Sequence, residues 1–539
     1  MKHGSSGTFL LFLSLLVGFL PGCLEQPPPI SSQVGATRVS GGILRIEAQN
    51  PGSLDPAFSR SYWESEIVLQ LFDGLLRFES DLSLAPAISE DWQISPDGRT
   101  YIFHLRRGVR FHNHREVTAD DFVYSLTRLL NPQLGSVDAG HYLMIRGAEA
   151  FHSGRTTRVE GLRGLDRYTL QIKLERIYAP FLCVLAQQSA SVVPREEVEN
   201  KTVPFGKRPV GTGAFRFKEW RPGEGIVLEA NTDYFESPPS LGEIHFRTVS
   251  PLNARGNFRE FSAGRVDMAF VPSDRAAEVK ANTQWVYWNR PILRFMYLGF
   301  NLNAPLVKEH ALRKAICLAI NRSKLVGNDP DYSVLFNLLP LSLLGSDLGH
   351  VQDSYDPQAA REALRRIPDR KGQDLKLALW HAALSEERQN LLSLLVSDLN
   401  ALGVNVELRI EPSMNALLER VYSGQTQMFL LGEVFDFPDP GAVLYRLFHS
   451  RSKGNLFAYR NVQVDRMLEE AQTLMDEYQR AQLYSQIERR ILNDNVVAPL
   501  FQVKYSIVTR RAVQGIELGP LGFQYLPFRK VWLKPEAKN

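Results

Sequence analysis

The sequence predicts an α/β fold divided into two or three domains. Its 539 residues are more than a single hydrophobic core usually organises. From about residue 290 onward, segments with helical periodicity alternate with strand-like segments, which is typical of a lobe with a largely parallel sheet. Hydrophobic residues make up 44% and charged residues 22% of the chain, so a mostly disordered protein is excluded.

The part of the chain before residue 290 contains short strands and two amphipathic helices. We expect a helix over residues 64–72, where apolar side chains recur at helical spacing and Gly74 follows as a stop. A second helix is expected over residues 120–130, because Thr118 supplies an N-cap hydroxyl ahead of an acidic first turn. The expected strands are residues 42–48, 101–105, 168–174, 214–218 and 226–229.

The part after residue 290 combines longer helices with short apolar strands. The expected helices are residues 308–321, 386–402 and 414–422, followed by two amphipathic helices within residues 464–493. The expected strands are residues 295–301, 375–380, 404–410 and 428–431. Helices that alternate with strands in this way favour parallel neighbours in the sheet.

The N-terminus has the pattern of an exported lipoprotein. An apolar run over residues 9–20 is shorter than the ~20 residues that a bilayer-spanning helix needs and has the length of a signal-peptide core. It ends in LPGC, which resembles the lipobox whose cysteine becomes the lipidated mature N-terminus, although Pro21 is unusual there. We predict lipidation of Cys23 and a stiff polar tether after it, with a cleaved signal and an incidental cysteine as the alternative.

Several other functions find no support in the sequence. The 62 Lys and Arg residues nearly balance the 59 Asp and Glu residues, so nucleic-acid binding is not indicated. His112 and His114 lack further metal ligands at suitable spacing, and no hydrolase or nucleotide-binding motif is complete. We therefore predict no catalytic residue, metal or cofactor. For Cys183 and Cys317, buried free thiols are the simpler interpretation and a disulfide bond is the alternative.

Three acids follow an apolar strand in the segment FLLGEVFDFPDP. Turn formation explains Asp439, because Asp before proline commonly starts a turn. Asp436 is less easily explained in this way, because it lies between two phenylalanines directly after the strand. A general acid and base built from these carboxylates, Glu433 among them, is an alternative that no second motif supports.

Seven short motifs occur along the chain in a characteristic order. They are SLDP (53–56), FDGL (72–75), PAISEDW (86–92), VTADDFVYS (117–125), GTGAF (211–215), NTDYF (231–235) and ALRKAI with NR (311–316 and 321–322). Together they resemble the motifs of the oligopeptide- and dipeptide-binding type of bacterial solute-binding protein, the binding component of ABC importers. Each motif alone is weak, but the resemblance extends over nearly the whole mature chain.

The resemblance implies an α/β, two-lobed periplasmic-binding-protein-like (class II) fold with hinge strands and an extra domain inserted in the first lobe. The implied segments are a lipoprotein signal peptide (1–22), a tether (23–40), the first part of lobe I (41–84), the inserted domain (85–203), the second part of lobe I (204–289), lobe II (290–507) and the C-terminal part of lobe I (508–539).

The resemblance also implies a peptide-binding function. The lobes would close on an extended peptide, and the closed monomer would deliver it to an ABC permease in the inner membrane, with the lipid as the only membrane anchor. Asp436 matches the residue that pairs with the peptide's α-amino group, which has a pKa of about 8 and is largely charged at neutral pH. The backbone groups of Gly432 and Val434 would pair with the peptide, and Tyr62 would present backbone from the other lobe.

Two positions depart from the family pattern. Leu430 stands where oligopeptide binders have an arginine that helps to receive the peptide carboxylate. Glu433 stands where a large aromatic residue is common, and our hypothesis is that it adds a preference for cationic ligands. The alternative is that Glu433 points to solvent.

Three other functions stay open at this point. The same fold could bind a non-peptide ligand such as nickel, haem, glutathione or a sugar. A protein of identical sequence pattern could pass its peptide to a signalling partner as a sensor. An exported hydrolase has the least support, because it would need a second polar cluster that converges on the three acids.

Overall fold

The computed structural model describes residues 40–59, 61–200, 202–248, 254–340, 342–346, 355–367, 375–383 and 386–535. The predicted signal peptide, Cys23 and all of the tether except its last residue lie outside these ranges. Within them, no helix has the length and apolar character needed to cross a membrane.

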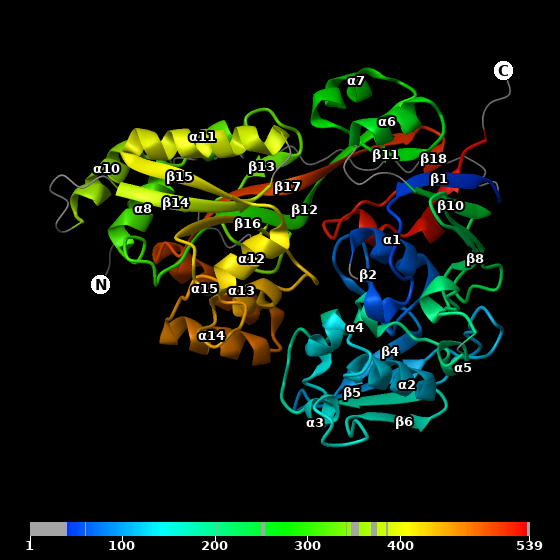
Figure 1. Ribbon diagram of the computed structural model, residues 1–539. Helices are drawn as coiled ribbons and strands as arrows, with labels where there is room; N and C mark the ends of the chain where they lie inside the picture. The colour runs from blue at the N-terminus through cyan, green and yellow to red at the C-terminus, as the bar shows by residue number, and fades with distance from the viewer. Residues whose placement is uncertain are drawn as a thin grey trace, which may run out of the picture. The chain divides into compact units, whose positions relative to one another are not determined.

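One large mixed sheet of eleven strands organises most of the described chain (Figure 1). Its strands in spatial order are β15 (Val404–Glu411), β14 (Leu375–Ala382), β16 (Met428–Val434), β12 (Trp285–Phe300), β17 (Val497–Arg510), β11 (Met268–Phe270), β1 (Ile43–Ala48), β10 (Glu243–Thr248), β9 (Gly225–Ala230) and β8 (Phe215–Arg221), with β13 (Tyr332–Val334) paired to β17. Strand β14 is parallel to β15 and β16, as the alternation of helices and strands predicts. The prediction of a largely parallel sheet is wrong for β12, β13 and β17, which pair antiparallel.

The two longest strands, β12 and β17, run side by side through the sheet. The C-terminal end of β17 also pairs with β11. The C-terminal end of β12 pairs with β16 along the edge that does not face β17. The sequence predicts only residues 295–301 of β12, because Pro291 interrupts the pattern and cannot donate a backbone hydrogen bond. The strand accommodates this proline through a shift of register between Pro291 and Phe295.

Helices cover both faces of the sheet in the part of the chain after residue 300. Figure 1 shows α11 (Glu386–Leu402) along one face of β14 and β15, and α13 (Gly441–Phe448), α14 (Val462–Thr473) and α15 (Glu477–Asn493) on the opposite side. Because side chains alternate along a strand, Leu298 packs into the core that contains α11, whereas Tyr297 packs into the core that contains α13 to α15. Because β16 pairs with β12, the same alternation sends successive side chains of β16 to these two cores in turn.

The part of the chain before β12 holds a second, antiparallel sheet. Its strands in spatial order are β4 (Ser89–Ile94), β5 (Thr100–Leu105), β7 (Thr169–Lys173) and β6 (Leu162–Asp166). Helix α2 (Ala119–Leu130) packs on β6 and β7 and begins as predicted at Thr118, whose backbone N–H donates to the Asp121 carboxylate at 2.8 Å. All four strands lie within the segment predicted as the inserted domain, whose boundaries stay a prediction.

The remaining helices and strands are short or flank the sheets. They are α1 (Tyr62–Leu71), β2 (Leu76–Phe78), β3 (Leu84–Pro86), α3 (Ala148–His152), α4 (Phe181–Leu185), α5 (Arg195–Val198), α6 (Ala254–Ser262), α7 (Ala276–Ala281), α8 (His310–Ala319), α9 (Arg322–Val326), α10 (Pro357–Arg365), α12 (Met414–Tyr422), β18 (Val513–Gln514) and β19 (Trp532–Leu533). The predicted helices over residues 386–402 and 414–422 have the bounds that the sequence indicates. Neither Cys183 nor Cys317 forms a disulfide bond within the described residues, as the simpler interpretation predicts, but only Cys317 is buried and Cys183 is half-buried.

The histidine motif and the glycine motif meet in one structural contact. The Gly211 N–H donates to Nδ1 of His112 at 3.2 Å, and Nε2 of His112 lies 3.0 Å from the Gly213 carbonyl oxygen. A Cβ atom on Gly211 would lie only 1.9 Å from the Leu71 carbonyl oxygen, so only glycine allows this close approach. His112 therefore fixes the loop before α2 to the glycine turn, which gives His112, Gly211 and Gly213 a structural role.

Candidate functional site

The backbone groups of Gly432 and Val434 point to an open edge of the sheet. Strand β14 is in register with β16 only as far as Phe429, and among the described residues no other strand continues this side. The Phe435 N–H donates to the Leu293 carbonyl at 3.0 Å, toward β12. Because backbone groups alternate between the two sides of an antiparallel pair, those of Gly432 and Val434 point away from β12. This edge can therefore pair with an additional extended chain.

Asp436 lies just beyond the end of β16 and is the accessible one of the three acids. Its side chain is 54% exposed, and its Oδ2 lies 4.0 Å from Nε2 of His141, which is itself 35% exposed. The His141 ring also meets Phe437 edge-on, with 6.0 Å between ring centroids. His141 belongs to the predicted inserted domain, so two segments distant in sequence contribute to the surroundings of this carboxylate.

Tyr525 adds a third segment to these surroundings. Burial raises the pKa of the Tyr525 hydroxyl, and the negative charges of Asp436 and Asp138 raise it further, which places the ring near both acids. The hydroxyl donates to Oε1 of Gln188 at 3.4 Å. The Tyr525 hydroxyl therefore stays neutral at physiological pH and adds no charge to the surroundings of Asp436.

Glu433 is buried and already paired. Its carboxylate forms an ion pair with Arg446 from α13 and accepts a hydrogen bond from the Tyr297 hydroxyl at 3.4 Å. Burial raises the pKa of Glu433, and the Arg446 guanidinium limits the rise. The alternative that Glu433 points to solvent is wrong, because its side chain lies on the face of β16 that packs against α13. A direct contact with a ligand stays a prediction, but Arg446 neutralises the charge that would attract a cation.

Asp439 forms the predicted turn, although it does so in the interior. Its Oδ1 accepts from the Gly441 N–H at 2.8 Å and from the Tyr484 hydroxyl at 3.0 Å. Its Oδ2 lies 3.5 Å from the buried guanidinium of Arg480. With every one of these partners inside the fold, Asp439 fixes the start of α13 and is not a residue of an exposed site.

Tyr62 is the first residue of helix α1, so its N–H has no acceptor within the helix. Its ring lies in an aromatic group, with centroid distances of 5.1 Å to Trp63 and 5.7 Å to Tyr505. Tyr505 in turn lies near Arg294, the register partner of Val434. Through Tyr505, Tyr62 therefore contacts β17, the neighbour of β12 in the large sheet. Gly432, Val434 and Asp436 lie together on one continuous segment.

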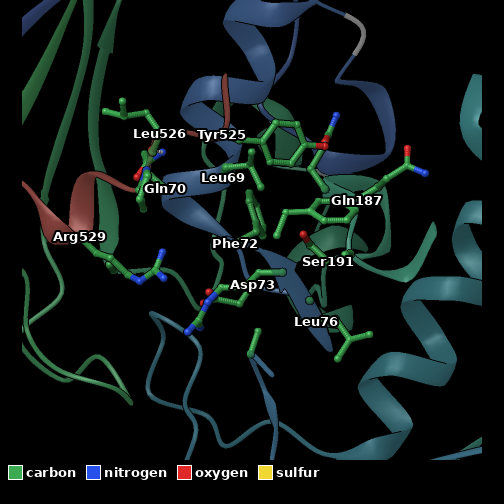
Figure 2. Close-up of a pocket in the computed structure, with 18 of the residues that line it drawn as sticks. Leu69, Gln70, Phe72, Asp73, Leu76, Gln187, Ser191, Tyr525, Leu526 and Arg529 are labelled. Carbon is green, nitrogen blue, oxygen red and sulfur yellow. Dashed lines mark hydrogen bonds between the residues drawn. The ribbon is translucent and has the colours of Figure 1, made fainter. Parts of the chain in front are cut away.

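A separate polar cavity lies beside α1 and the C-terminal segment (Figure 2). Asp73 accepts hydrogen bonds there from Thr212 and Tyr234, each at 3.1 Å. Figure 2 shows Arg529 on one side of the cavity and Tyr525 at its top, and Arg529 forms ion pairs with two glutamates. These polar groups therefore have partners within the fold. The C-terminal segment is joined to α1 by Gln70, whose side chain donates to the Leu526 carbonyl at 3.2 Å and accepts from the Phe528 N–H at 3.2 Å.

A comparison with protein families shows which class of protein carries this site. Residues 83–455, more than half of the chain, match the family model "Bacterial extracellular solute-binding proteins, family 5 Middle". The chain belongs to this family. Family members bind solutes outside the cytoplasmic membrane, as the family name states, which agrees with the predicted export.

Curated relatives resemble the chain over nearly its whole length. The dipeptide-binding protein DppE of Bacillus subtilis is 25% identical over 94% of this chain and 95% of its own. The oligopeptide-binding protein AppA of the same organism is 25% identical over 99% of this chain and 100% of its own. The family prediction made from the motifs is therefore confirmed.

Solved structures confirm the two-lobed class II fold. DppA from Helicobacter pylori, solved with the peptide STSA, aligns with a TM-score of 0.75 at 23% identity and covers 92% of this chain and 99% of its own. AppA from Bacillus subtilis, solved with a nonapeptide, aligns with a TM-score of 0.71 at 21% identity and covers 93% and 100%. At this identity the likeness concerns the fold alone.

Sequence reasoning missed the partners of the predicted residues. His141, Tyr525 and Arg446 carry no motif. His141 and Arg446 lie in different segments from Asp436 and Glu433, with which they pair, and Tyr525 feels the charge of Asp436 from the C-terminal segment. Of these three residues, only Arg446 could have been found from the sequence. It lies in an amphipathic helix directly after the acids, and the apolar face of such a helix packs back against the strand before it.

Proposed function

We propose that this protein is the substrate-binding lipoprotein of an ABC importer, which closes its two lobes on an extended peptide and delivers it to the permease. The observation that carries the proposal is the open edge of β16, with Asp436 at its end. The printed names of curated relatives, which include dipeptide- and oligopeptide-binding proteins, support the same ligand class.

The open edge accounts for binding that does not depend on peptide sequence. An extended peptide offers a regular series of N–H and C=O groups, and the groups of Gly432 and Val434 can pair with it as a neighbouring strand would. The N–H of Tyr62, at the start of α1, supplies a donor from the first lobe. Main-chain pairing supplies affinity, while side-chain pockets decide which peptides are preferred.

Asp436 accounts for the anchoring of one end of the ligand. The α-amino group is largely charged at neutral pH and would lose its hydration when the lobes enclose it. The half-exposed carboxylate of Asp436 provides both a counter-charge and a hydrogen-bond acceptor for an ammonium group. The weak contact with His141, at 4.0 Å, leaves the carboxylate able to accept that group.

The test compares free and N-acetylated peptides on the wild-type protein. Native mass spectrometry identifies the peptide that copurifies with the protein, and calorimetry then measures that peptide and its acetylated form after the ligand has been removed. We expect the free-amino form to bind at least about 100-fold more tightly, because the acetylated form leaves Asp436 enclosed without a counter-charge. Equal affinities for both forms would exclude the role of Asp436, and the absence of any peptide binding would exclude the proposed function.

The proposed anchor at Cys23 is tested by fractionation. A Cys23→Ser variant is expected to lose the mass of the lipid and to move from the membrane fraction to the soluble fraction, because a diacyl anchor is needed for stable membrane attachment. The motif LPGC supports this proposal. Unchanged membrane association of the variant would contradict it.

A further inference from the structure

Strand β15 forms one end of the large sheet. It pairs with β14 along its whole length without a shift of register, and among the described residues no strand lies on its other side. Its residues 407–410 are all exposed. Two of them are apolar, and the exposed fractions are 39% for Leu408 and 64% for Ile410. A regular and exposed edge strand of this kind can pair with the edge of another chain.

The backbone groups of Leu408 and Ile410 point away from the sheet. The first N–H after β14 donates to the Glu411 carbonyl at 2.9 Å, so the backbone groups of Glu411 face β14. The Val406 N–H instead donates to Oδ1 of Asn400 in α11, at 3.2 Å. Because backbone groups alternate along a strand, those of Leu408 and Ile410 lie on the same outer side as those of Val406. Asn400 thus occupies one outer donor, and the next outer groups along β15 are available for a further strand.

The opposite edge of the sheet differs from β15 in this respect. Strand β8 carries a similar pair of charges, Glu219 and Arg221, which lie 2.9 Å apart. However, its register shifts between Phe217 and Glu219, and Nζ of Lys207 lies over the Trp220 ring, 3.8 Å from the ring centroid. Irregular backbone and covering side chains discourage pairing between edges. Strand β15 has no register shift, and its central residues are exposed.

The charges of β15 allow a second copy of the strand to approach without repulsion. Glu407 and Arg409 flank Leu408, lie on one face and form an exposed ion pair, with 2.6 Å between Oε1 and Nη2. If two copies run antiparallel with their Leu408 residues opposite each other, Glu407 of each copy lies opposite Arg409 of the other. A two-fold centre at Glu407 or at Arg409 would place like charges opposite each other. The register centred on Leu408 therefore gives a network of four alternating charges.

We propose that two copies of this protein associate through β15, antiparallel and centred on Leu408, so that the large sheet continues across a two-fold axis. The outer N–H and C=O groups of the two Leu408 residues would pair with each other, and the Ile410 N–H would donate to the Val406 carbonyl of the other copy. On one face Leu408 packs against its counterpart and Ile410 against Val406, while the charged residues meet on the other face. This association goes beyond the proposed function and does not depend on the ligand.

The association is expected to be weak. A single pair of strand segments, residues 405–411 of each copy, buries less than the roughly 1,200 Å² of a stable interface. Exposed ion pairs contribute little unless they form a network, and salt weakens them. We expect a Kd on the order of 10–100 µM at low salt. The monomer predicted from the sequence is then the form present in dilute solution.

Sedimentation equilibrium tests the register through reversed charges. The full chain is measured with Cys23→Ser, which lacks the proposed lipid, so that detergent micelles do not bring copies together. We expect Glu407→Arg and Arg409→Glu each to weaken self-association at least about tenfold, because each places like charges opposite each other. The double variant Glu407→Arg/Arg409→Glu should restore it. An equimolar mixture of the two single variants should associate more tightly than either alone, which a folding defect would not produce.

A matched control reverses a charge on the other edge strand. Arg221→Glu breaks the pair with Glu219 on β8 and should leave self-association unchanged. Hydrogen exchange at the amides of Leu408 and Ile410 should become slower when the wild-type protein is concentrated. A wild-type protein that stays monomeric up to about 500 µM would overturn the inference. Self-association that neither charge reversal on β15 changes would also overturn it, because a different surface would then join the copies.

Discussion

An Asp436→Ala variant is expected to bind a free-amino peptide about 3–5 kcal/mol more weakly than the wild-type protein, which is roughly a hundred- to several-thousand-fold in Kd. Asp436 is half exposed in this structure, so the full effect requires that the bound peptide and the closing lobes exclude water from the carboxylate. Calorimetry with the copurified peptide measures the loss. The affinity for an N-acetylated peptide should fall little in this variant, because that peptide carries no ammonium group that could lose its counter-charge.

Asp91→Ala provides a matched control for this effect. Asp91 lies 3.9 Å from His104 on the antiparallel sheet and is 64% exposed, so it forms a similar histidine–aspartate contact away from β16. This variant should bind the peptide with wild-type affinity. A loss in Asp91→Ala equal to that in Asp436→Ala would show that a change of net charge, and not a local contact, weakens binding.

The second large effect concerns stability. An Arg446→Met variant is expected to lower the free energy of unfolding by about 3 kcal/mol, because it leaves the Glu433 carboxylate buried with only the Tyr297 hydroxyl as a partner. We choose the low end of the range for a broken buried pair because Arg446 is 40% exposed. Urea denaturation measures the loss, and Arg409→Met, which breaks an exposed pair with Glu407, should cost less than about 1 kcal/mol.

The pH dependence distinguishes this mechanism from lost packing. Without Arg446, the effect of burial on Glu433 is unopposed, and the pKa of its carboxyl in the folded state rises further above the unfolded value. Stability that depends on the protonated form is present below the unfolded pKa and is lost as the pH rises through the folded pKa. The defect of Arg446→Met should therefore be smaller at pH 4 than at pH 8, and Glu433→Gln/Arg446→Met should remove this dependence. A defect of constant size would point to packing alone.

Several features of this chain can be predicted from local sequence because local physics decides them. The helix over residues 386–402 follows from its apolar spacing and the glycine after it, and the start of α2 follows from the cap at Thr118. Asp436 could be singled out because a carboxylate between two phenylalanines after a strand has no local explanation. The order of the motifs predicted the family, which the comparison confirmed.

Other features depend on which segments meet, and no local pattern predicts that. The sequence shows β12 as a short strand, because Pro291 breaks its alternation, and its full length becomes apparent only through its pairing with β17. The burial of Asp439 depends on Arg480 and Tyr484, which are about 40 residues away on another helix. A strand edge stays open only if no other strand covers it, so the open edge at Gly432 is likewise a property of the assembled sheet.

The three acids show where the division lies. The sequence by itself determined that Asp436 is unusual, that Asp439 forms a turn, and that the chain has the motifs of a solute-binding protein. Only the tertiary structure decided that Glu433 faces Arg446 in the interior, and that β15 lies at one end of the sheet. The reason is physical. Successive side chains of a strand point to opposite faces of the sheet, but the residues that each of them contacts belong to helices and strands from distant parts of the chain.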